Sequence, residues 1–424
     1  KIYKKRSVDD VLASKLEVFG AVLITGPKSC GKSTTGEQKS KTVIKFQDKK
    51  KKEYYDSIFS SYSQEILEGE KPILYDEWQD YKDIWDMIRL YIDESGTSGQ
   101  FILTGSSSQF VETKHTGTGR ISTLKMYPLT LYESGDSNGQ ISIKELFKNP
   151  KSFKRCTCNL DYRDYAYLIC RGGWPRILEI KNKDKHLDLA IDIYNEIILK
   201  DVKSVDKSCV NQQIVKEILH SYSRHICSLA KSTTIYDDIK ETKNDRTIRR
   251  YVNALKMLCV IENIDAWNLN IKSKNAIRST SKKNFVDPSI AAAALGLGPE
   301  ALIKNPEYFG HLFESMCIRD LRVYGGQYST LNYYRDRNGV ECDTVLRLHN
   351  GDYALIEIKL GQASVHDAIK NLNIIEQEII DYNKTVEDKN KRKLPSFKMV
   401  ITMDDIGYTA VNDVLVVPLG CLKD

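Results

Sequence analysis

Residues 26–33 read Gly-Pro-Lys-Ser-Cys-Gly-Lys-Ser, which fits the pattern G-x-x-x-x-G-K-[ST] at every fixed position. The glycines let the backbone curl so that consecutive N–H groups point at phosphate oxygens. Lys32 is then placed to reach the β- and γ-phosphates of ATP, and the Ser33 hydroxyl to bind Mg²⁺. The predicted nucleotide contacts are Gly26, Pro27, Lys28, Ser29, Cys30, Gly31, Lys32, Ser33 and Thr34.

A second stretch that could take part in catalysis is residues 72–77, Pro-Ile-Leu-Tyr-Asp-Glu. Here an apolar run, expected to be buried, ends in two adjacent carboxylates. An Asp at the end of such a strand can hold Mg²⁺ beside the Ser33 hydroxyl, so Asp76 is the second predicted metal ligand. Glu77 can then polarise the water that attacks the γ-phosphate, which makes it the predicted general base.

Two further residues are candidates for the same reaction. Residues 101–106 form another apolar run that ends in small polar residues, and Ser106 or Thr104 could position the attacking water. Arg120 follows in a Gly-rich stretch and could stabilise the charge of the transition state, in the same chain or from a neighbouring subunit. An arginine in a surface ion pair explains Arg120 equally well.

Short apolar runs at 21–24, 42–46, 73–75 and 101–104 are typical of buried strands and would carry these residues. A helix is expected from Ser7, and another directly after Gly31, whose N-terminal N–H groups would face the phosphates. In this order the motifs GPKSCGKST, ILYDE, FILTGSS and GRISTLKMYPLTLYE resemble the AAA-type P-loop ATPases that are fused to a C-terminal domain of unknown function. The resemblance implies a parallel sheet with helices on both faces, and ATP with Mg²⁺ as cofactors.

The middle of the chain is expected to be helical, after a turn-rich break at 134–139. Gly172-Gly173-Trp174-Pro175 is interpreted as a structural turn. Residues 232–264 are interpreted as a winged helix-turn-helix whose second helix spans about 245–258. Two roles remain open for its polar face, DNA recognition and an ordinary solvated surface. That face carries Arg246, Arg249, Arg250, Asn253 and Lys256.

The last part of the chain contains two Asn-Gly pairs, at 338–339 and 350–351, between runs of alternating polarity, which is a hairpin signal. Pairing the apolar faces of the second hairpin requires Asp343 to lie opposite Glu357. A three-residue loop, 349–351, with Gly351 in a left-handed conformation gives that register. Asp343, Glu357 and Lys359 then share one face.

Two carboxylates that share a face with a lysine can bind Mg²⁺ and activate water for phosphodiester cleavage, and Glu314 could add a further carboxylate. The order of elements around Glu314, Asp343, Glu357 and Lys359 resembles the PD-(D/E)xK nuclease fold, with Cys342 where that family often has Pro. Such domains also serve as binding platforms that do not cleave, and the sequence leaves both roles open.

Composition is that of an ordinary globular protein of 424 residues, with 28% charged residues and a net charge of +6. The ten cysteines show no zinc spacing, which indicates reduced thiols and a cytoplasmic location. No apolar run approaches the roughly 18 residues that a membrane span needs, so no membrane span is expected. We therefore expect an α/β protein with three parts: a P-loop AAA-type ATPase domain (1–135), a helical linker and winged-helix region (136–290), and a PD-(D/E)xK nuclease-like, that is restriction-endonuclease-like, α/β domain (291–424).

Two classes of function remain open for the whole chain. The first is an ATP-dependent nuclease or DNA-processing motor that acts on or near nucleic acid. The second is a nucleotide-gated switch or interaction protein whose C-terminal domain is catalytically inactive. The expected partners are ATP and ADP, with DNA and further copies of the chain as candidates. A nucleotide kinase is disfavoured because the Asp76-Glu77 pair suits attack by water.

Overall fold

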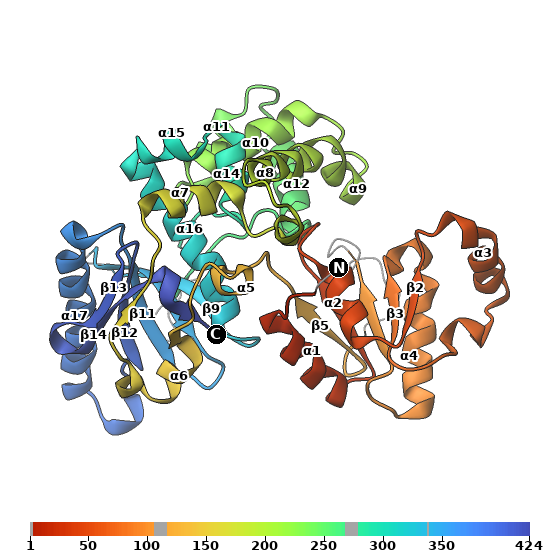
Figure 1. The fold of residues 1–424 in the computed structure, drawn as a ribbon, viewed down its shortest axis with the longest axis horizontal. Helices are drawn as coiled ribbons and strands as arrows, with labels where there is room; N and C mark the ends of the chain where they lie inside the picture. The colour runs from red at the N-terminus through yellow and green to blue at the C-terminus, as the bar shows by residue number, and fades with distance from the viewer. Residues whose placement is uncertain (1–2, 106–116, 268–278, 337–338) are drawn as a thin grey trace. The chain divides into compact units, whose positions relative to one another are not determined.

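A computed structural model describes residues 3–105, 117–267, 279–336 and 339–424. The chain divides into two compact units (Figure 1). The first unit comprises Lys1–Pro128 with the short segment Ala254–Cys259, and the second comprises Leu129–Asn253 with Val260–Asp424. Each unit has its own sheet, and each is described by itself below.

The first unit is built on a five-stranded sheet in which all neighbouring strands are parallel. Its three central strands are almost entirely buried because both of their faces are covered, while the two edge strands are partly exposed. In spatial order they are β2 (Thr42–Lys45), β3 (Ile73–Asp76), β4 (Phe101–Thr104), β1 (Ala21–Thr25) and β5 (Ile121–Lys125). The parallel sheet implied by the resemblance is confirmed.

Alternate residues of these strands face two different helical layers. Ala21 and Leu23 pack with apolar residues of α3 (Lys52–Ser61) and α4 (Asp83–Ser95). Val22 and Ile24 pack instead with Leu12 of α1 (Ser7–Val18). Helix α2 (Lys32–Lys39) lies close to the sheet through Gly36, where a Cβ would come within 2.9 Å of the Leu74 side chain. Short 3-10 turns complete the unit at η1 (Lys49–Lys51), η2 (Gln64–Leu67) and η3 (Trp78–Tyr81).

The second unit begins with a helical region. Helices α7, α8, α10 and α14 contact one another there, and Figure 1 shows them grouped with α15. The helices are α5 (Leu131–Ser134), α6 (Ile143–Lys148), α7 (Tyr162–Arg171), α8 (Asp184–Glu196), α9 (Val202–Val205), α10 (Gln212–Arg224), α11 (Ser232–Asp238), α12 (Asp245–Met257), α14 (Ser289–Ala294), α15 (Pro299–Ile303) and α16 (Pro306–Tyr324). The last turn of α12, from Ala254, is assigned to the first unit.

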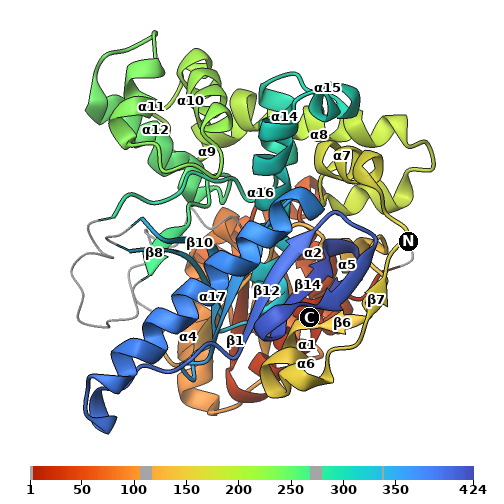
Figure 2. The same cartoon turned by 90° about the vertical axis from the view of Figure 1, so that its left-hand side faces the viewer.

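The sheet of the second unit has eight strands and mixed directions. In spatial order they are β7 (Cys156–Thr157), β13 (Ile406–Thr409), β14 (Val414–Pro418), β12 (Phe397–Thr402), β11 (Tyr353–Ile358), β10 (Glu341–Arg347), β9 (Thr330–Arg335) and β8 (Asp265–Trp267). Helix α17 (Gln362–Lys384) packs along β10, β11, β12 and β14 (Figure 2). A small separate sheet pairs β15 (Leu422–Lys423) with β6 (Ile141–Ser142). Residues 141–157 and 265–267, expected in the middle region, thus add strands to the C-terminal sheets.

The hairpin of β10 and β11 has the register that the apolar alternation predicted. Thr344 pairs with Ile356 and Arg347 with Tyr353, and the same register sets Asp343 opposite Glu357. Gly351 adopts φ +86°, and its amide donates to the carbonyl of Leu348. The three-residue loop and its left-handed glycine are therefore confirmed. The other Asn-Gly pair lies partly outside the described residues, because residue 338 is one of those not described.

Candidate nucleotide-binding site and a buried carboxylate–lysine cluster

The loop between β1 and α2 is sharply curled. Gly26, Ser29 and Gly31 have positive φ angles of 146°, 65° and 100°. At Gly26 a Cβ would stand 2.4 Å from the carbonyl oxygen of Met126, so no larger residue fits. Helix α2 begins directly after Gly31, so the free N–H groups of its first turn face the concave side of the loop.

The Lys32 side chain folds back over this loop. Its Nζ donates to the carbonyl oxygens of Gly26, at 3.1 Å, and Pro27, at 2.9 Å. Ser33 and Thr34 follow in the first turn of α2 and are half-buried, while Lys28 and Ser29 are exposed at the tip of the loop. The ammonium group, the curled amides and the two hydroxyls therefore surround one concave surface, which suits a phosphate chain.

The two carboxylates lie at the same edge of the sheet as the loop. Asp76 pairs with Thr104 across β3 and β4, and Thr104 in turn pairs with Ile24 of β1. The Thr104 hydroxyl donates to Asp76 Oδ1 at 2.6 Å. The three strands thus end at one level, with β4 between the strand that carries Asp76 and the strand that leads into the loop.

Glu77 has a left-handed backbone, with φ 57°, directly after β3. Burial raises the pKa of Glu77, although a hydrogen bond from Gln79 and the nearby Lys32 ammonium oppose the shift. A carboxylate with a raised pKa accepts a proton more readily at neutral pH, as a general base requires.

The other two residues expected in catalysis have different outcomes. Ser106 lies outside the described residues. Arg120 immediately precedes β5, and its carbonyl accepts from the amide of Ala21 at the start of β1. This position is the edge of the sheet opposite the loop, so the structure does not bring Arg120 to the phosphate-binding loop of the same chain. Its side chain is 43% exposed and pairs with Asp93 at 2.6 Å.

Sequence reasoning missed a contact behind the loop. The buried guanidinium group of Arg6 donates to the carbonyl of Cys30, at 3.0 Å, and to the carbonyl of Tyr127, at 2.8 Å. The Tyr3 hydroxyl lies 3.2 Å from Thr35 Oγ1 in α2. The available signal in the sequence was an arginine directly before the start of a helix.

In the second unit, the structure brings together the four residues predicted from the C-terminal pattern. Lys359 Nζ lies 3.0 Å from Asp343 Oδ2 and 2.7 Å from Glu357 Oε2. Asp343 Oδ2 also accepts the amide of Ile358, and Glu357 Oε1 accepts Asn371 of α17. Glu314, on α16, joins this group through a further residue.

That residue is Lys282, which the sequence did not single out. Its Nζ lies 2.9 Å from Glu314 Oε1 and 3.8 Å from Asp343 Oδ1. The side chain is 8% exposed. We call these five residues the acid–lysine cluster: Lys282, Glu314, Asp343, Glu357 and Lys359.

Burial and mutual charge shift the pKa values in this cluster. Burial raises the pKa of Glu314 to about 7, although Lys282 opposes the shift. Burial, reinforced by the charge of Asp343, raises the pKa of Glu357 to about 8. Burial would also raise the pKa of Asp343, but Lys282 and Lys359 outweigh it and hold that pKa at about 2. Asp343 is thus the carboxylate that both ammonium groups stabilise.

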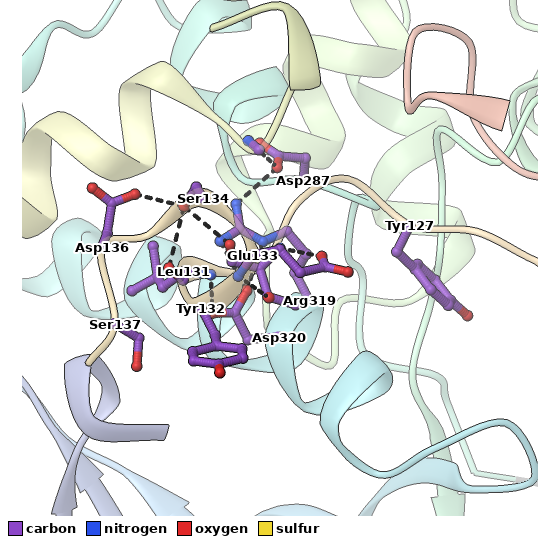
Figure 3. Close-up of polar contacts among 12 residues, drawn as sticks. Tyr127, Leu131, Tyr132, Glu133, Ser134, Asp136, Ser137, Asp287, Arg319 and Asp320 are labelled. Atoms are coloured by element: carbon purple, nitrogen blue, oxygen red, sulfur yellow. Dashed lines mark hydrogen bonds and ion pairs between the residues drawn. The ribbon is translucent and has the colours of Figure 1, made fainter. Parts of the chain in front are cut away.

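A different buried charge network fixes the start of the second unit (Figure 3). Arg319 of α16 pairs with Asp287 at 3.0 Å and with Asp320 at 2.8 Å. Asp320 accepts the amide of Leu131, and Asp287 accepts the amide of Gly173. This network anchors the first turn of α5 and the turn at 172–175, which is the structural role expected for that turn.

Helix α12 occupies the position predicted for the second helix of a winged helix. Ile248 and Val252 are buried there. Two antiparallel bridges follow, Ile261 with Phe285 and Ile264 with Lys282, and residues 268–278 between them lie outside the described residues. The residues expected on the open face are all exposed: Arg246, Arg249, Arg250, Asn253 and Lys256.

Two structural features are absent from the described parts of the chain. Within them no helix is long and apolar enough to cross a membrane. Over the same residues, no group of three or more His, Cys, Asp or Glu side chains is arranged to hold a metal ion.

Comparison with known protein families gives three matches. An AAA domain matches residues 19–134, a domain of unknown function (DUF8612) matches 162–301, and another (DUF4143) matches 309–422. No curated protein matches the chain.

Solved structures give distant similarities. A replication initiator DnaA bound to AMPPCP and single-stranded DNA is 14% identical, with a TM-score of 0.27 over 59% of this chain and 86% of that one. A DNA replication initiation factor is 15% identical, with a TM-score of 0.28 over 59% and 85%. A signal transduction ATPase with a tetratricopeptide repeat sensor from Pyrococcus horikoshii is 11% identical, with a TM-score of 0.22 over 75% and 48%. The AAA domain match and the parallel sheet together make the first unit a P-loop ATPase domain of the AAA type, a class that binds and hydrolyses nucleotides.

Proposed function

We propose that the first unit binds ATP with Mg²⁺ and hydrolyses it to ADP and phosphate. The observation that carries this proposal is the common edge of the parallel sheet, where the curled loop and the Asp76-Glu77 pair meet. Backbone amides of residues 28–34 hold the phosphates, and Lys32 leaves its carbonyl partners to neutralise the β- and γ-phosphates.

The donor groups present fit a magnesium ion. Ser33 offers a hydroxyl and Asp76 a carboxylate, and hard cations of this size prefer such oxygen ligands. When bound, the ion supplies positive charge that polarises the phosphate oxygens. Glu77 accepts a proton from the attacking water, and Thr104 orients Asp76 through its hydroxyl.

The test of this proposal is Lys32→Ala, with ATP binding measured by titration calorimetry on the full chain. We expect the variant to lose detectable ATP binding because it lacks the ammonium group that would neutralise the β- and γ-phosphates. Lys39→Ala, at the last turn of the same helix, is the matched control and should bind as wild type does. Wild-type affinity in Lys32→Ala would overturn the proposal.

For the second unit we propose a PD-(D/E)xK-like fold that acts as a nucleotide-gated interaction platform without cleaving nucleic acid. The helix, strand, strand-Asp, strand-Glu-x-Lys, helix, strand order supports the fold. The occupation of the carboxylates by two ammonium groups favours a role without cleavage over the nuclease role. The exposed basic face of α12 supports DNA as a partner.

The experiment is a panel of single- and double-stranded DNA and RNA incubated with the full chain, ATP and either Mg²⁺ or Mn²⁺. We expect no cleavage, together with ATP turnover that rises when DNA is added. Cleavage that disappears in Asp343→Ala would contradict the platform role and establish the nuclease role.

A further inference from the structure

The position of Lys282 in the acid–lysine cluster is unusual for a lysine. Its Nζ lies within 3.3 Å of a helix carboxylate oxygen, on Glu314, and of a strand carbonyl oxygen, on Asp343. The Asp343 carboxylate is 3.8 Å away. Two carboxylates and a backbone carbonyl are the kind of oxygen set that a divalent cation takes in proteins. Here that set surrounds an ammonium group.

A pair of backbone hydrogen bonds to Ile264 holds Lys282 in this place. Its amide donates to the carbonyl of Ile264 at 2.8 Å, and its carbonyl accepts the amide of Ile264 at 3.0 Å. Residue 282 lies outside the stretch matched by the C-terminal family, residues 309–422, to which the three carboxylates belong. The ammonium group of Lys282 therefore comes from a segment of the same unit that lies outside the matched C-terminal stretch.

A second ammonium group, that of Lys359, lies near the other carboxylate oxygen of Asp343. Lys359 contacts both Asp343 and Glu357, while the Asp343 Oδ2 atom also accepts a backbone amide. A divalent ion near Asp343 would lie close to the buried Lys282 ammonium group and the partly buried Lys359 ammonium group. Like charges repel strongly where water is excluded. The residues present thus do not fit the metal ion that the nuclease-like fold implies.

We propose that Lys282 is a built-in cation that takes the place of a divalent metal ion in the acid–lysine cluster. The lysine holds Glu314 and Asp343 together and makes the C-terminal domain insensitive to Mg²⁺ and Mn²⁺. This inference deepens the proposed platform role of the second unit, and it does not depend on ATP hydrolysis by the first.

The test measures Mn²⁺ binding to the full chain without nucleotide, by the electron paramagnetic resonance signal of free Mn²⁺. To silence the first unit, all proteins carry Lys32→Ala and Asp76→Asn. We expect no Mn²⁺ site that depends on Asp343 in the parent. Lys282→Met should gain such a site, so that its Mn²⁺ affinity exceeds that of the parent protein by at least about tenfold, the scale on which groups around a metal site change its affinity.

Two control variants make the result specific. Adding Asp343→Asn to Lys282→Met should remove the gained site. Lys398→Met removes another buried lysine of the same sheet, which pairs with Glu376 alone among carboxylates in the described residues, and should gain no Mn²⁺ site. If Lys282→Met does not fold, Lys282→Gln, which keeps hydrogen bonds to the carboxylates, decides the question by the same measurement.

Thermal unfolding gives a second readout. Mn²⁺ should raise the melting temperature of the Lys282 variant and leave that of Lys398→Met unchanged. The proposal is overturned if the parent binds Mn²⁺ in a manner lost in Asp343→Asn, or if removal of Lys282 yields no gain. Neither outcome involves cleavage, so failure here is separate from failure of the platform role, which the nucleic-acid panel measures.

Discussion

Arg6 connects the N-terminal segment to the phosphate-binding loop through two backbone carbonyls, those of Cys30 and Tyr127. Replacing the Arg6 side chain with a methyl group would remove this hydrogen-bond donor from both carbonyls, which are wholly or partly buried. An unpaired buried polar group costs about 1–3 kcal/mol. The loop would therefore be both less stable and less well positioned for phosphate.

We predict that Arg6→Ala lowers the melting temperature and weakens ATP binding, because Cys30 is part of the loop. Calorimetric titration with ATP and a thermal melt measure the two effects. Lys5→Ala is the matched control, since the Lys5 side chain is 69% exposed and pairs with exposed Asp10. Equal ATP affinity in Arg6→Ala and Lys5→Ala would show that Arg6 does not position the loop.

Glu77 leads to a pH prediction. Burial raises its pKa above the ordinary carboxyl value, and the base works only in its charged form. The kcat for ATP hydrolysis should therefore fall as the pH drops through that raised pKa, and reach a plateau above it. Glu77→Gln should bind ATP, lower kcat by about 100-fold or more, and lose this acid limb. A profile with the same acid limb in Glu77→Gln would exclude Glu77 as the base.

At the scale of elements, the hairpin of β10 and β11 shows how one residue fixes a register. Gly351 has φ +86° and open space around its Cβ position, so a side chain there would be strained by the backbone alone. Gly310, inside α16, has ordinary helical geometry, and a Cβ there would meet Leu360 at 3.8 Å, an ordinary contact.

These two glycines make a paired prediction. Gly351→Ala should lower the free energy of unfolding by about 1–2 kcal/mol, because a left-handed L-residue is unfavourable. Gly310→Ala should raise it by about 0.5–1 kcal/mol, because alanine is a better helix former. Urea unfolding monitored by circular dichroism compares the two variants. If the free energy of unfolding of Gly351→Ala were as high as that of Gly310→Ala or higher, the proposed basis of the register would be contradicted.

Elements with clear periodicity were predictable from the sequence. The apolar alternation of residues 342–358 determined the β10–β11 register, and the loop pattern at 26–33 placed the start of α2. Strands β6, β7 and β8 were not predictable, because two or three residues carry no period and pair with strands far along the chain. Lys282 was missed for the same reason, since its partners lie 32 and 61 residues away.

The position of Arg120 bears on how copies of the chain could assemble. It lies at the edge of the sheet opposite the loop, where it pairs with Asp93. If it contributes charge to ATP hydrolysis, that contribution reaches the phosphate-binding loop of another copy. An arginine that acts in this way affects turnover and leaves nucleotide binding by its own chain intact.

We predict that Arg120→Ala binds ATP normally and hydrolyses it at least about tenfold more slowly. This lower bound on the decrease in kcat is far smaller than the decrease seen when other ATPases and GTPases lose an arginine supplied in trans. Mixing it with Lys32→Ala should restore part of the activity, because each variant keeps the group that the other lacks. Arg89→Ala, which loses contacts to the same Asp93, is the matched control and should stay active. Turnover by the mixture equal to the sum of the separate variants would confine Arg120 to a surface ion pair.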